Sequence, residues 1–128
     1  MDPGWFVSVE DEVVEVEPAP GVFMRPVFGE GLNLSFVRML PNSEAPLHQH
    51  DEEQIGFVLS GACELTLGDE VRTLHAGDVY VAPPRVPHGA VTRDDGCRII
   101  DAFAPPREAL RELMEQAMRR RSSPDTTA

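Results

Sequence analysis

The sequence predicts an all-β fold of the sandwich or barrel kind, followed by one C-terminal amphipathic helix. Short runs rich in β-branched and aromatic residues recur at intervals of roughly 8–12 residues, and clusters of Gly, Pro, Asn or Asp separate them, which is typical of an all-β domain. After residues 105–106, both proline, the apolar residues recur at helical spacing instead. The chain has 128 residues, so we expect both patterns to belong to a single domain.

Nine segments are expected to be strands, each roughly four to eight residues long. In chain order they are 5–9, 21–28, 33–39, 55–61, 63–68, 70–75, 79–82, 89–92 and 97–103. We expect a tight hairpin at Gly68 and Asp69, which separate two of these strands. The acidic segment 10–17 is interpreted as a solvated edge strand, whose charges discourage pairing with other chains.

The C-terminal helix is expected to run from Arg107 to about Arg121. Its apolar side chains fall on one stripe and are Leu110, Leu113, Met114, Ala117 and Met118. The arginines at 119–121 suit the negative end of the helix dipole. We expect the stripe to pack across the sheets or against the second copy in a homodimer. The domain then spans residues 1–121, and the polar segment 122–128 is expected to be a disordered tail.

The composition excludes several classes of partner. A formal net charge of −11 and a pI of about 4.6 disfavour nonspecific binding to nucleic acid or to anionic membranes. No run of about 18 apolar residues is present that could span a membrane. Residues 1–12 carry neither the basic nor the apolar region of a secretory signal, so we expect a cytoplasmic protein. Cys63 and Cys97 lack CxxC spacing, and we expect two buried thiols rather than a disulfide.

The histidines suggest a metal site. In an extended strand His48 and His50 would point to the same face, and Gln54 keeps that parity if the segment stays extended. His88 follows the proline-rich segment 83–87, which stiffens the backbone as it approaches this third imidazole. Three imidazoles and one amide oxygen as a weak fourth ligand could bind one divalent ion per chain, and Zn, Ni, Mn or Fe all suit such a site.

The spacing of these residues resembles the two motifs of the cupin family. The first motif, G-x5-H-x-H-x3,4-E-x6-G, matches at Asn42, His48, His50, Gln54 and Gly61, with Asn in the first Gly position and Gln in the Glu position. The second motif, G-x5-P-x-G-x2-H-x3-N, matches at Gly77, Pro83, Arg85, His88 and Thr92, with Arg in a Gly position and Thr in the Asn position. The motifs cover residues 42–92, and the resemblance implies a double-stranded β-helix, or jelly-roll barrel.

A narrower resemblance is to the pectin-degradation cupins. The segments "HDEEQIGFVLSG", "AGDVYVAPPRVPHGA" and "DAFAPPREAL" carry it. It implies that His48, His50, Gln54 and His88 are metal ligands, and that the enzyme converts unsaturated uronates into linear keto forms. The D-x-F-x-P-x-R signature of those enzymes falls on Asp101, Phe103, Pro105 and Arg107.

The residue types fit such chemistry without the resemblance. Asp101 and Phe103 share one face of the segment 97–103, and a carboxylate on an otherwise apolar inward face is costly unless it has a partner or a function. Near a metal Asp101 could move protons, and Arg107 could hold a substrate carboxylate. Arg107 could instead pair with a neighbouring glutamate, Asp101 could form a salt bridge, and Phe103 could simply pack in the core. Tyr80 is expected at the edge of the pocket.

The sequence therefore predicts a dimeric, cytoplasmic cupin metalloenzyme that catalyses non-redox proton transfer on a small carboxylated or hydroxylated substrate, such as an unsaturated uronate. A cupin polyketide cyclase is an alternative, although a four-histidine site is expected there and Gln54 argues against it. An Fe(II) dioxygenase and a noncatalytic ligand-binding cupin are the others. The acidic residues at 51–53 are expected to face solvent and to steer cations rather than to bind the metal.

Overall fold

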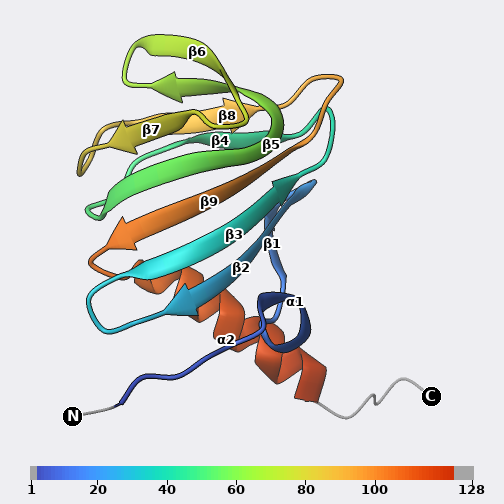
Figure 1. Ribbon diagram of the computed structural model, residues 1–128, viewed down its shortest axis with the longest axis vertical. Coiled ribbons are helices and arrows are strands. Elements are labelled where there is room, and N and C mark those ends of the chain that lie inside the picture. The colour runs from blue at the N-terminus through green and yellow to red at the C-terminus, as the bar shows by residue number, and fades with distance from the viewer. Residues whose placement is uncertain (1–2, 123–128) are drawn as a thin grey trace.

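Strands that alternate apolar and polar residues roll into an antiparallel barrel, and one long helix packs against it (Figure 1). The computed structural model describes residues 3–122. Its elements are α1 (Val9–Glu12), β1 (Val16–Ala19), β2 (Val22–Phe28), β3 (Asn33–Met39), β4 (Glu44–His48), β5 (Glu53–Leu67), β6 (Glu70–His75), β7 (Val79–Ala82), β8 (His88–Val91), β9 (Cys97–Ala104) and α2 (Glu108–Ser122). The predicted tail lies outside the described residues, except for Ser122, which ends α2.

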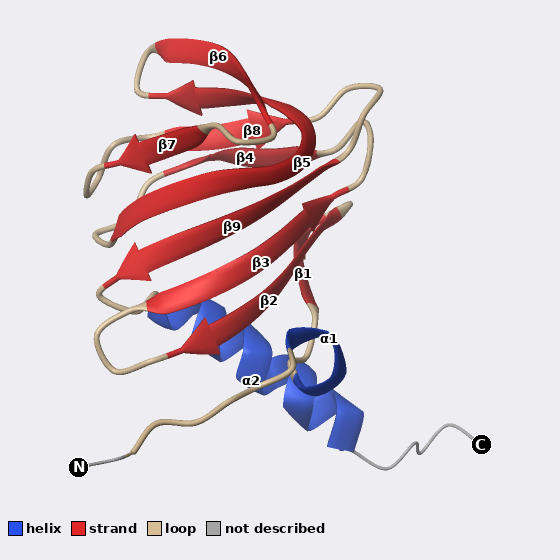
Figure 2. Cartoon of the chain, viewed as in Figure 1, coloured by secondary structure: helices blue, strands red, loops and turns tan. Residues whose placement is uncertain are grey.

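The strands are hydrogen-bonded in the order β1-β2-β3-β9-β5-β8-β4, and β6 and β7 also pair with β5. Every pair is antiparallel. Figure 2 shows the strands as one twisted, nearly closed body with α2 at its β1–β2 end. This architecture confirms the predicted all-β jelly-roll barrel with one C-terminal helix.

Strand β5 is the centre of the fold because its two halves pair with different neighbours. The first half pairs with β9 and β7, and the second half pairs with β6 and β8. Between the halves Gly61 has a φ of +77°, and a Cβ there would lie 2.0 Å from the Gly96 carbonyl oxygen. The two strands predicted at 55–61 and 63–68 are therefore one strand, because the chain bends at Gly61 without leaving the sheet.

Alternate residues of β3 and β9 point into the barrel and are buried there. On β9 these are Cys97, Ile99, Asp101 and Phe103, which confirms the predicted shared face. The interior is mostly apolar, with Val58 fully buried at its centre. Both cysteines are buried free thiols, also as predicted.

Helix α2 covers β1 and β2 with the predicted apolar stripe. Leu110 and Ala117 are buried, and Leu113 and Met114 are half-buried against the β1 side of the barrel. Met118 differs from the prediction, because its side chain is 52% exposed near the C-terminal end of the helix. Neither α1 nor α2, the helices of the described chain, is long and apolar enough to cross a membrane.

The N-terminal prediction is wrong. Residues 5–8 form no strand, and the acidic segment 10–17 is not an edge strand over most of its length but begins with the short helix α1. The Ser8 amide donates to the Glu12 carboxylate at 2.7 Å, so acidic side chains satisfy the amides at the start of this turn. Val16 alone pairs within the acidic part, opposite Met24 of β2.

Strand β4 was not among the predicted strands because Pro46 interrupts it. Proline removes one donor from the ladder, and the register with β8 shifts between Ala45 and His48. Two residues in Gly positions of the cupin motifs, Asn42 and Arg85, have φ of 55° and 65°. They are the two non-glycine residues with positive φ in the described chain. Both positions therefore keep the left-handed backbone conformation that favours the glycine of the motifs.

Candidate metal centre and proton-transfer site

Three histidines from separate segments converge at one end of the barrel. His48 ends β4 and pairs with His88, the first residue of β8, whereas His50 lies in the loop after β4. One ligand nitrogen from each ring lies within 4.8 Å of those from the other two. The sequence thus predicted the cluster correctly, although the strand ends before His50 and parity alone does not place that residue.

Hydrogen bonds fix the tautomer of each ring. The Nδ1 atoms of His48, His50 and His88 lie 2.8, 3.0 and 2.9 Å from the backbone carbonyl oxygens of residues two positions away in the chain. A carbonyl only accepts, so each Nδ1 carries the proton and each Nε2 offers a lone pair. Hydrogen-bonded second nitrogens of this kind are typical of histidines that bind metals.

His48 and His88 are also held in the neutral form. Burial lowers the pKa of His88 to about 4, and the hydrogen bond to the Val86 carbonyl only partly opposes this shift. Burial likewise lowers the pKa of His48, again against the effect of its backbone hydrogen bond. Neutral imidazole is the form that coordinates a cation, so both rings are ready to bind at neutral pH.

Gln54 completes the donor set. Its side chain is buried, and its Oε1 lies 3.0 Å from His50 Nε2 and 2.9 Å from His88 Nε2. With each Nδ1 protonated, the amide oxygen and the two Nε2 atoms are all acceptors, an arrangement that suits ligands gathered around one cation. Three imidazole nitrogens and one neutral oxygen suit a divalent transition metal, so the residues present fit the ion that the sequence implies.

Asp101 and Tyr80 lie directly behind Gln54. The Gln54 amide nitrogen donates to the Tyr80 hydroxyl at 2.6 Å, and that hydroxyl donates to Asp101 Oδ1 at 2.7 Å. Asp101 is buried, and burial raises its pKa to about 6, although hydrogen bonds from Tyr80 and Gln54 and the charge of Arg107 oppose the shift. The alternative in which Asp101 forms a salt bridge is not what the structure shows, because its hydrogen-bond partner is the Tyr80 phenol.

Phe103 and Arg107 extend the site beyond the histidines. The Phe103 ring is buried and its centroid lies 5.7 Å from that of His50. The Arg107 guanidinium carbon lies 5.7 Å from the Phe103 centroid. Among residues 3–122 no carboxylate forms an ion pair with Arg107, and Glu108 pairs with Arg111 instead. The alternative in which Arg107 is neutralised by a neighbouring glutamate is therefore not what the structure shows.

One cavity joins these residues. Its volume is about 50 Å³, and every predicted site residue except His50 lines it. Its inner part is apolar and includes Val22, Met24, Met39 and Ile99. The cavity therefore combines a polar mouth with an apolar interior.

Four contributors to the site were missed in the sequence. Glu52 was expected to face solvent, but its carboxylate lies 3.3 Å from His50 Nδ1 and its side chain is only 19% exposed. Asn33 accepts the Arg107 backbone amide at 2.7 Å. A Cβ at Gly56 would lie 2.5 Å from Asp101 Oδ1, so glycine makes room for that carboxylate. Ser35 pairs with Asp101 across the sheet, and its buried hydroxyl has no hydrogen-bond partner in the described chain.

Of these, only Gly56 has a sequence signal, namely a glycine inside a strand. Asn33, Ser35 and Glu52 act through partners distant in the chain or through loop geometry, and no local pattern marks them. Asp51 and Glu53 are exposed, as expected.

Comparison with known proteins identifies the family. The model of the cupin domain matches residues 35–103, and the chain therefore belongs to the cupin family. It is similar to the pectin degradation protein KdgF of Dickeya dadantii, with 30% identity over 101 residues that cover 77% of this chain and 92% of that protein. It is also similar to the H2HPP isomerase of Bacillus subtilis, with 46% identity over 56 residues, 43% of this chain but only 24% of that protein.

Solved structures show the same relationships. KdgF from a Halomonas species superposes with a TM-score of 0.74 and 32% identity, covering 84% of this chain and 97% of that one. The polyketide cyclase RemF from Streptomyces resistomycificus has a TM-score of 0.69 and 25% identity, with 79% of each chain covered. The named relatives thus include an isomerase, pectin-degradation proteins and a cyclase.

Proposed function

We propose that this cupin is a metal-dependent enzyme that catalyses non-redox proton transfer on a small carboxylated substrate, and that ketonisation of an unsaturated uronate is the specific reaction. The observation that carries the proposal is a cluster of three histidines beside a cavity that an amide oxygen, a buried carboxylate and a half-buried guanidinium also line. The similarity to KdgF over 92% of that protein's length supports the uronate version.

His48, His50, Gln54 and His88 would hold one divalent ion, with Zn, Ni, Mn and Fe as the candidates. Because all four ligands are neutral, the bound ion would keep its full positive charge and would polarise a substrate hydroxyl or carbonyl oxygen. A carboxylate at position 54 would neutralise part of that charge. The glutamine therefore favours Lewis-acid chemistry at this site.

Arg107 would bind the substrate, and Asp101 would transfer the protons. Arg107 forms no ion pair among the described residues, although the charges of Glu52 and Asp101 act on it, so its guanidinium would be able to bind the substrate carboxylate with two hydrogen bonds. Asp101 would accept a proton from a substrate hydroxyl as a ring hemiacetal opens, and would return one to the neighbouring carbon as the enol becomes a ketone. No electrons leave the substrate, so the reaction needs no oxidant. Phe103 would shield these groups from water.

The cyclase alternative also has one supporting observation. The polyketide cyclase RemF has a similar fold at 25% identity. The donor set argues against it, because Gln54 takes the place of the fourth histidine that we expect in such cyclases. The oxygenase and the noncatalytic alternatives have no observation of their own and are separated by experiment.

We also expect a homodimer formed through the outer face of the barrel. Ile55, Phe57 and Leu59 of β5 and Val79 and Val81 of β7 are 40–55% exposed on adjacent strands. An exposed apolar patch of this kind marks an interaction surface in a soluble protein.

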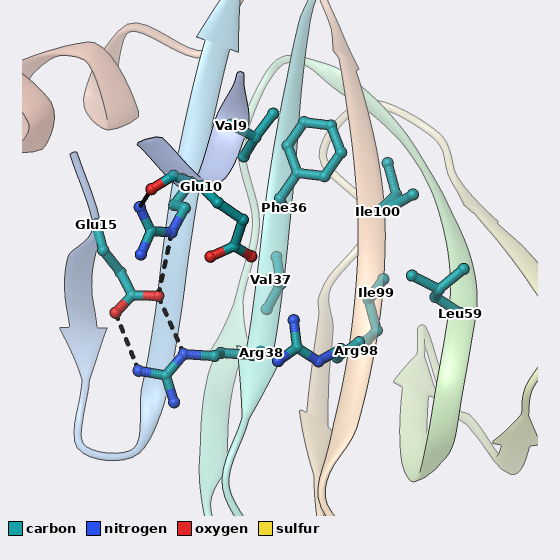
Figure 3. Close-up of a pocket in the computed structure, with 11 residues that line it drawn as sticks. Val9, Glu10, Glu15, Phe36, Val37, Arg38, Leu59, Arg98, Ile99 and Ile100 are labelled. Atoms are coloured by element: carbon teal, nitrogen blue, oxygen red, sulfur yellow. Dashed lines mark hydrogen bonds and ion pairs between the residues drawn. The ribbon is translucent and has the colours of Figure 1, made fainter. Parts of the chain in front are cut away.

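A second copy is the occupant that the charges favour. The centre of the patch is uncharged in a chain of net charge −11, so two copies can meet there without bringing acidic groups together. Figure 3 shows the adjoining hollow of about 260 Å³, where Arg38 and Arg98 lie beside Phe36, Leu59 and Ile100. Glu10 and Glu15 also line this hollow, and Glu15 pairs with Arg38 at 3.0 Å, so the charges beside the patch are partly balanced within one chain.

The test is turnover of an unsaturated uronate by Zn- or Ni-loaded protein without oxygen. We expect loss of the ultraviolet absorbance of the conjugated double bond and, in D₂O, incorporation of deuterium at one carbon. Arg107→Ala should raise KM more than it lowers kcat. Strict dependence on oxygen and Fe(II) would establish the dioxygenase alternative, and binding without turnover would establish the noncatalytic one.

A further inference from the structure

We infer that Tyr80 is a positioning residue, which determines that the oxygen rather than the nitrogen of the Gln54 amide faces the three histidines. The inference rests on the proposed metal site. A glutamine amide has two ends of nearly equal shape, of which only the oxygen can bind a metal ion. A glutamine ligand therefore needs a neighbour that distinguishes the two ends, whereas a glutamate ligand does not.

The hydrogen bonds around Tyr80 run in one direction. Its hydroxyl has a single hydrogen, which it donates to Asp101 Oδ1 at 2.7 Å. It can therefore offer only a lone pair to Gln54, and the amide nitrogen donates to it at 2.6 Å. If the amide rotated by half a turn, its oxygen would meet the hydroxyl lone pairs and two acceptors would face each other in a buried place. Tyr80 thus excludes the rotated amide.

The fold keeps Tyr80 in this position. The side chain is buried, and Tyr80 pairs with Gly56 of β5. A Cβ on Gly56 would lie 2.1 Å from Tyr80 Cε1, so any other residue there would displace the ring. Tyr80 does line the cavity, as predicted for a pocket residue. Its hydroxyl, however, already bonds two protein groups, which explains its position better than contact with a substrate does.

The experiment is a double-mutant cycle read as Zn²⁺ affinity. The full chain, freed of metal, is titrated with Zn²⁺ in competition with a chromogenic chelator. Tyr80→Phe removes the hydroxyl and keeps the ring, and we expect Zn²⁺ to bind roughly 10–100-fold more weakly, the range for losing a group that orients a ligand. In the Gln54→Glu background both ends of the side chain are oxygen, so the same change should alter the affinity by less than about threefold.

A matched control separates positioning from general stability. Thr92 follows the last residue of β8, at the end of that strand opposite His88; it is buried, and its hydroxyl donates to the Leu40 carbonyl at 2.6 Å. Thr92→Val also removes a bonded, buried hydroxyl and should lower the unfolding temperature while leaving Zn²⁺ affinity unchanged. Asp101→Ala gives a second route to the same answer. It frees the Tyr80 hydrogen to point at Gln54, and it should weaken Zn²⁺ binding even if Tyr80→Phe does not fold.

The outcomes distinguish this inference from the proposed function. If Tyr80→Phe and Asp101→Ala bind Zn²⁺ as the parent does, Tyr80 does not position Gln54. Equal losses in the Gln54 and Gln54→Glu backgrounds would show that Tyr80 acts on the site without orienting the amide, and would also overturn the inference. If the parent itself does not bind Zn²⁺, or binds it without the histidines, the metal site fails and this inference fails with it.

Discussion

The inner and outer faces of the sheet formed by β9, β5 and β7 use neighbouring residues of the same strands for different purposes. On the inner face Tyr80 connects Gln54 and Asp101 through hydrogen bonds of 2.6 and 2.7 Å that leave one arrangement. On the outer face Ile55 and Phe57 offer apolar area without directional contacts. The inner face depends on the directions of its hydrogen bonds, whereas the outer face depends on its exposed apolar area.

The difference indicates how each face should respond to mutation. A directional network fails when one atom is lost, because every remaining partner is left buried and unsatisfied. An apolar surface loses binding in proportion to the area removed, unless a charge is introduced. Changes on the inner face should therefore alter chemistry, and changes on the outer face should alter assembly.

The largest effect is expected from removing a metal ligand on the inner face. His88→Ala should lose most of the bound divalent ion and reduce turnover to below about one hundredth of the parent rate, because a ligand matters more than a group that merely orients one. Metal analysis of the purified protein measures the loss. Gln54→Ala should weaken binding less, since an amide oxygen is the poorest ligand of the four. Stoichiometric metal retained by His48→Ala, His50→Ala and His88→Ala alike would refute the site.

Asp101→Asn should leave metal content and fold intact while lowering turnover roughly 10²–10⁴-fold, the usual contribution of one acid–base group. Asparagine can still accept the Tyr80 hydrogen bond but cannot take up a proton at neutral pH. Steady-state kinetics on metal-loaded protein provides the measurement. Turnover at the parent rate would mean that Asp101 is structural.

Phe57→Glu tests the outer face. Facing glutamates near the two-fold axis of a dimer should repel each other and raise the dissociation constant at least about tenfold. The mass in solution, measured by light scattering, should fall toward that of one chain while metal content stays constant. Val71→Glu, an exposed apolar residue on β6 outside this face, is the matched control. If the parent is already monomeric, the dimer assignment is wrong.

The smallest effect is expected at Ser35, the inner-face hydroxyl without a partner in the described chain. Ser35→Ala removes an unsatisfied buried group, so the free energy of unfolding should be unchanged or should rise by up to about 1 kcal/mol. Urea unfolding measures it. A loss of turnover at constant stability would instead show that the hydroxyl contacts the substrate.

The sequence could predict what short-range periodicity determines. The parity of residues 97–103 placed Asp101 and Phe103 on the inner face, and the motif spacing brought the histidines together. The predicted strand at 5–9 was wrong. The apolar residues Trp5 and Phe6 favoured a strand, but Ser8 and the acidic residues after it stabilise a helical turn.

The parts that could not be predicted depend on contacts between distant segments. The pairing of β5 with β7 places the Tyr80 hydroxyl beside Gln54. Gly56 of β5, opposite Tyr80, leaves room for the tyrosine ring. Glu52 turns toward His50 because of the loop between β4 and β5. None of these contacts repeats along the chain, so no periodic pattern reveals them.

Strand β5 also limits how the length of this protein can change during evolution or engineering. It runs unbroken from Glu53 to Leu67 and pairs with four other strands. Inserting one residue just after Glu53 would slide the following register: the inserted residue would take the place of Gln54, Gln54 would turn outward, and Ile55 would take the place of Gly56 beside Tyr80 and Asp101. We would expect such an insertion to abolish the proposed metal binding and the proposed dimer together. Insertions should be accepted at the Gly68–Asp69 hairpin instead, where added residues would leave every inward position unchanged.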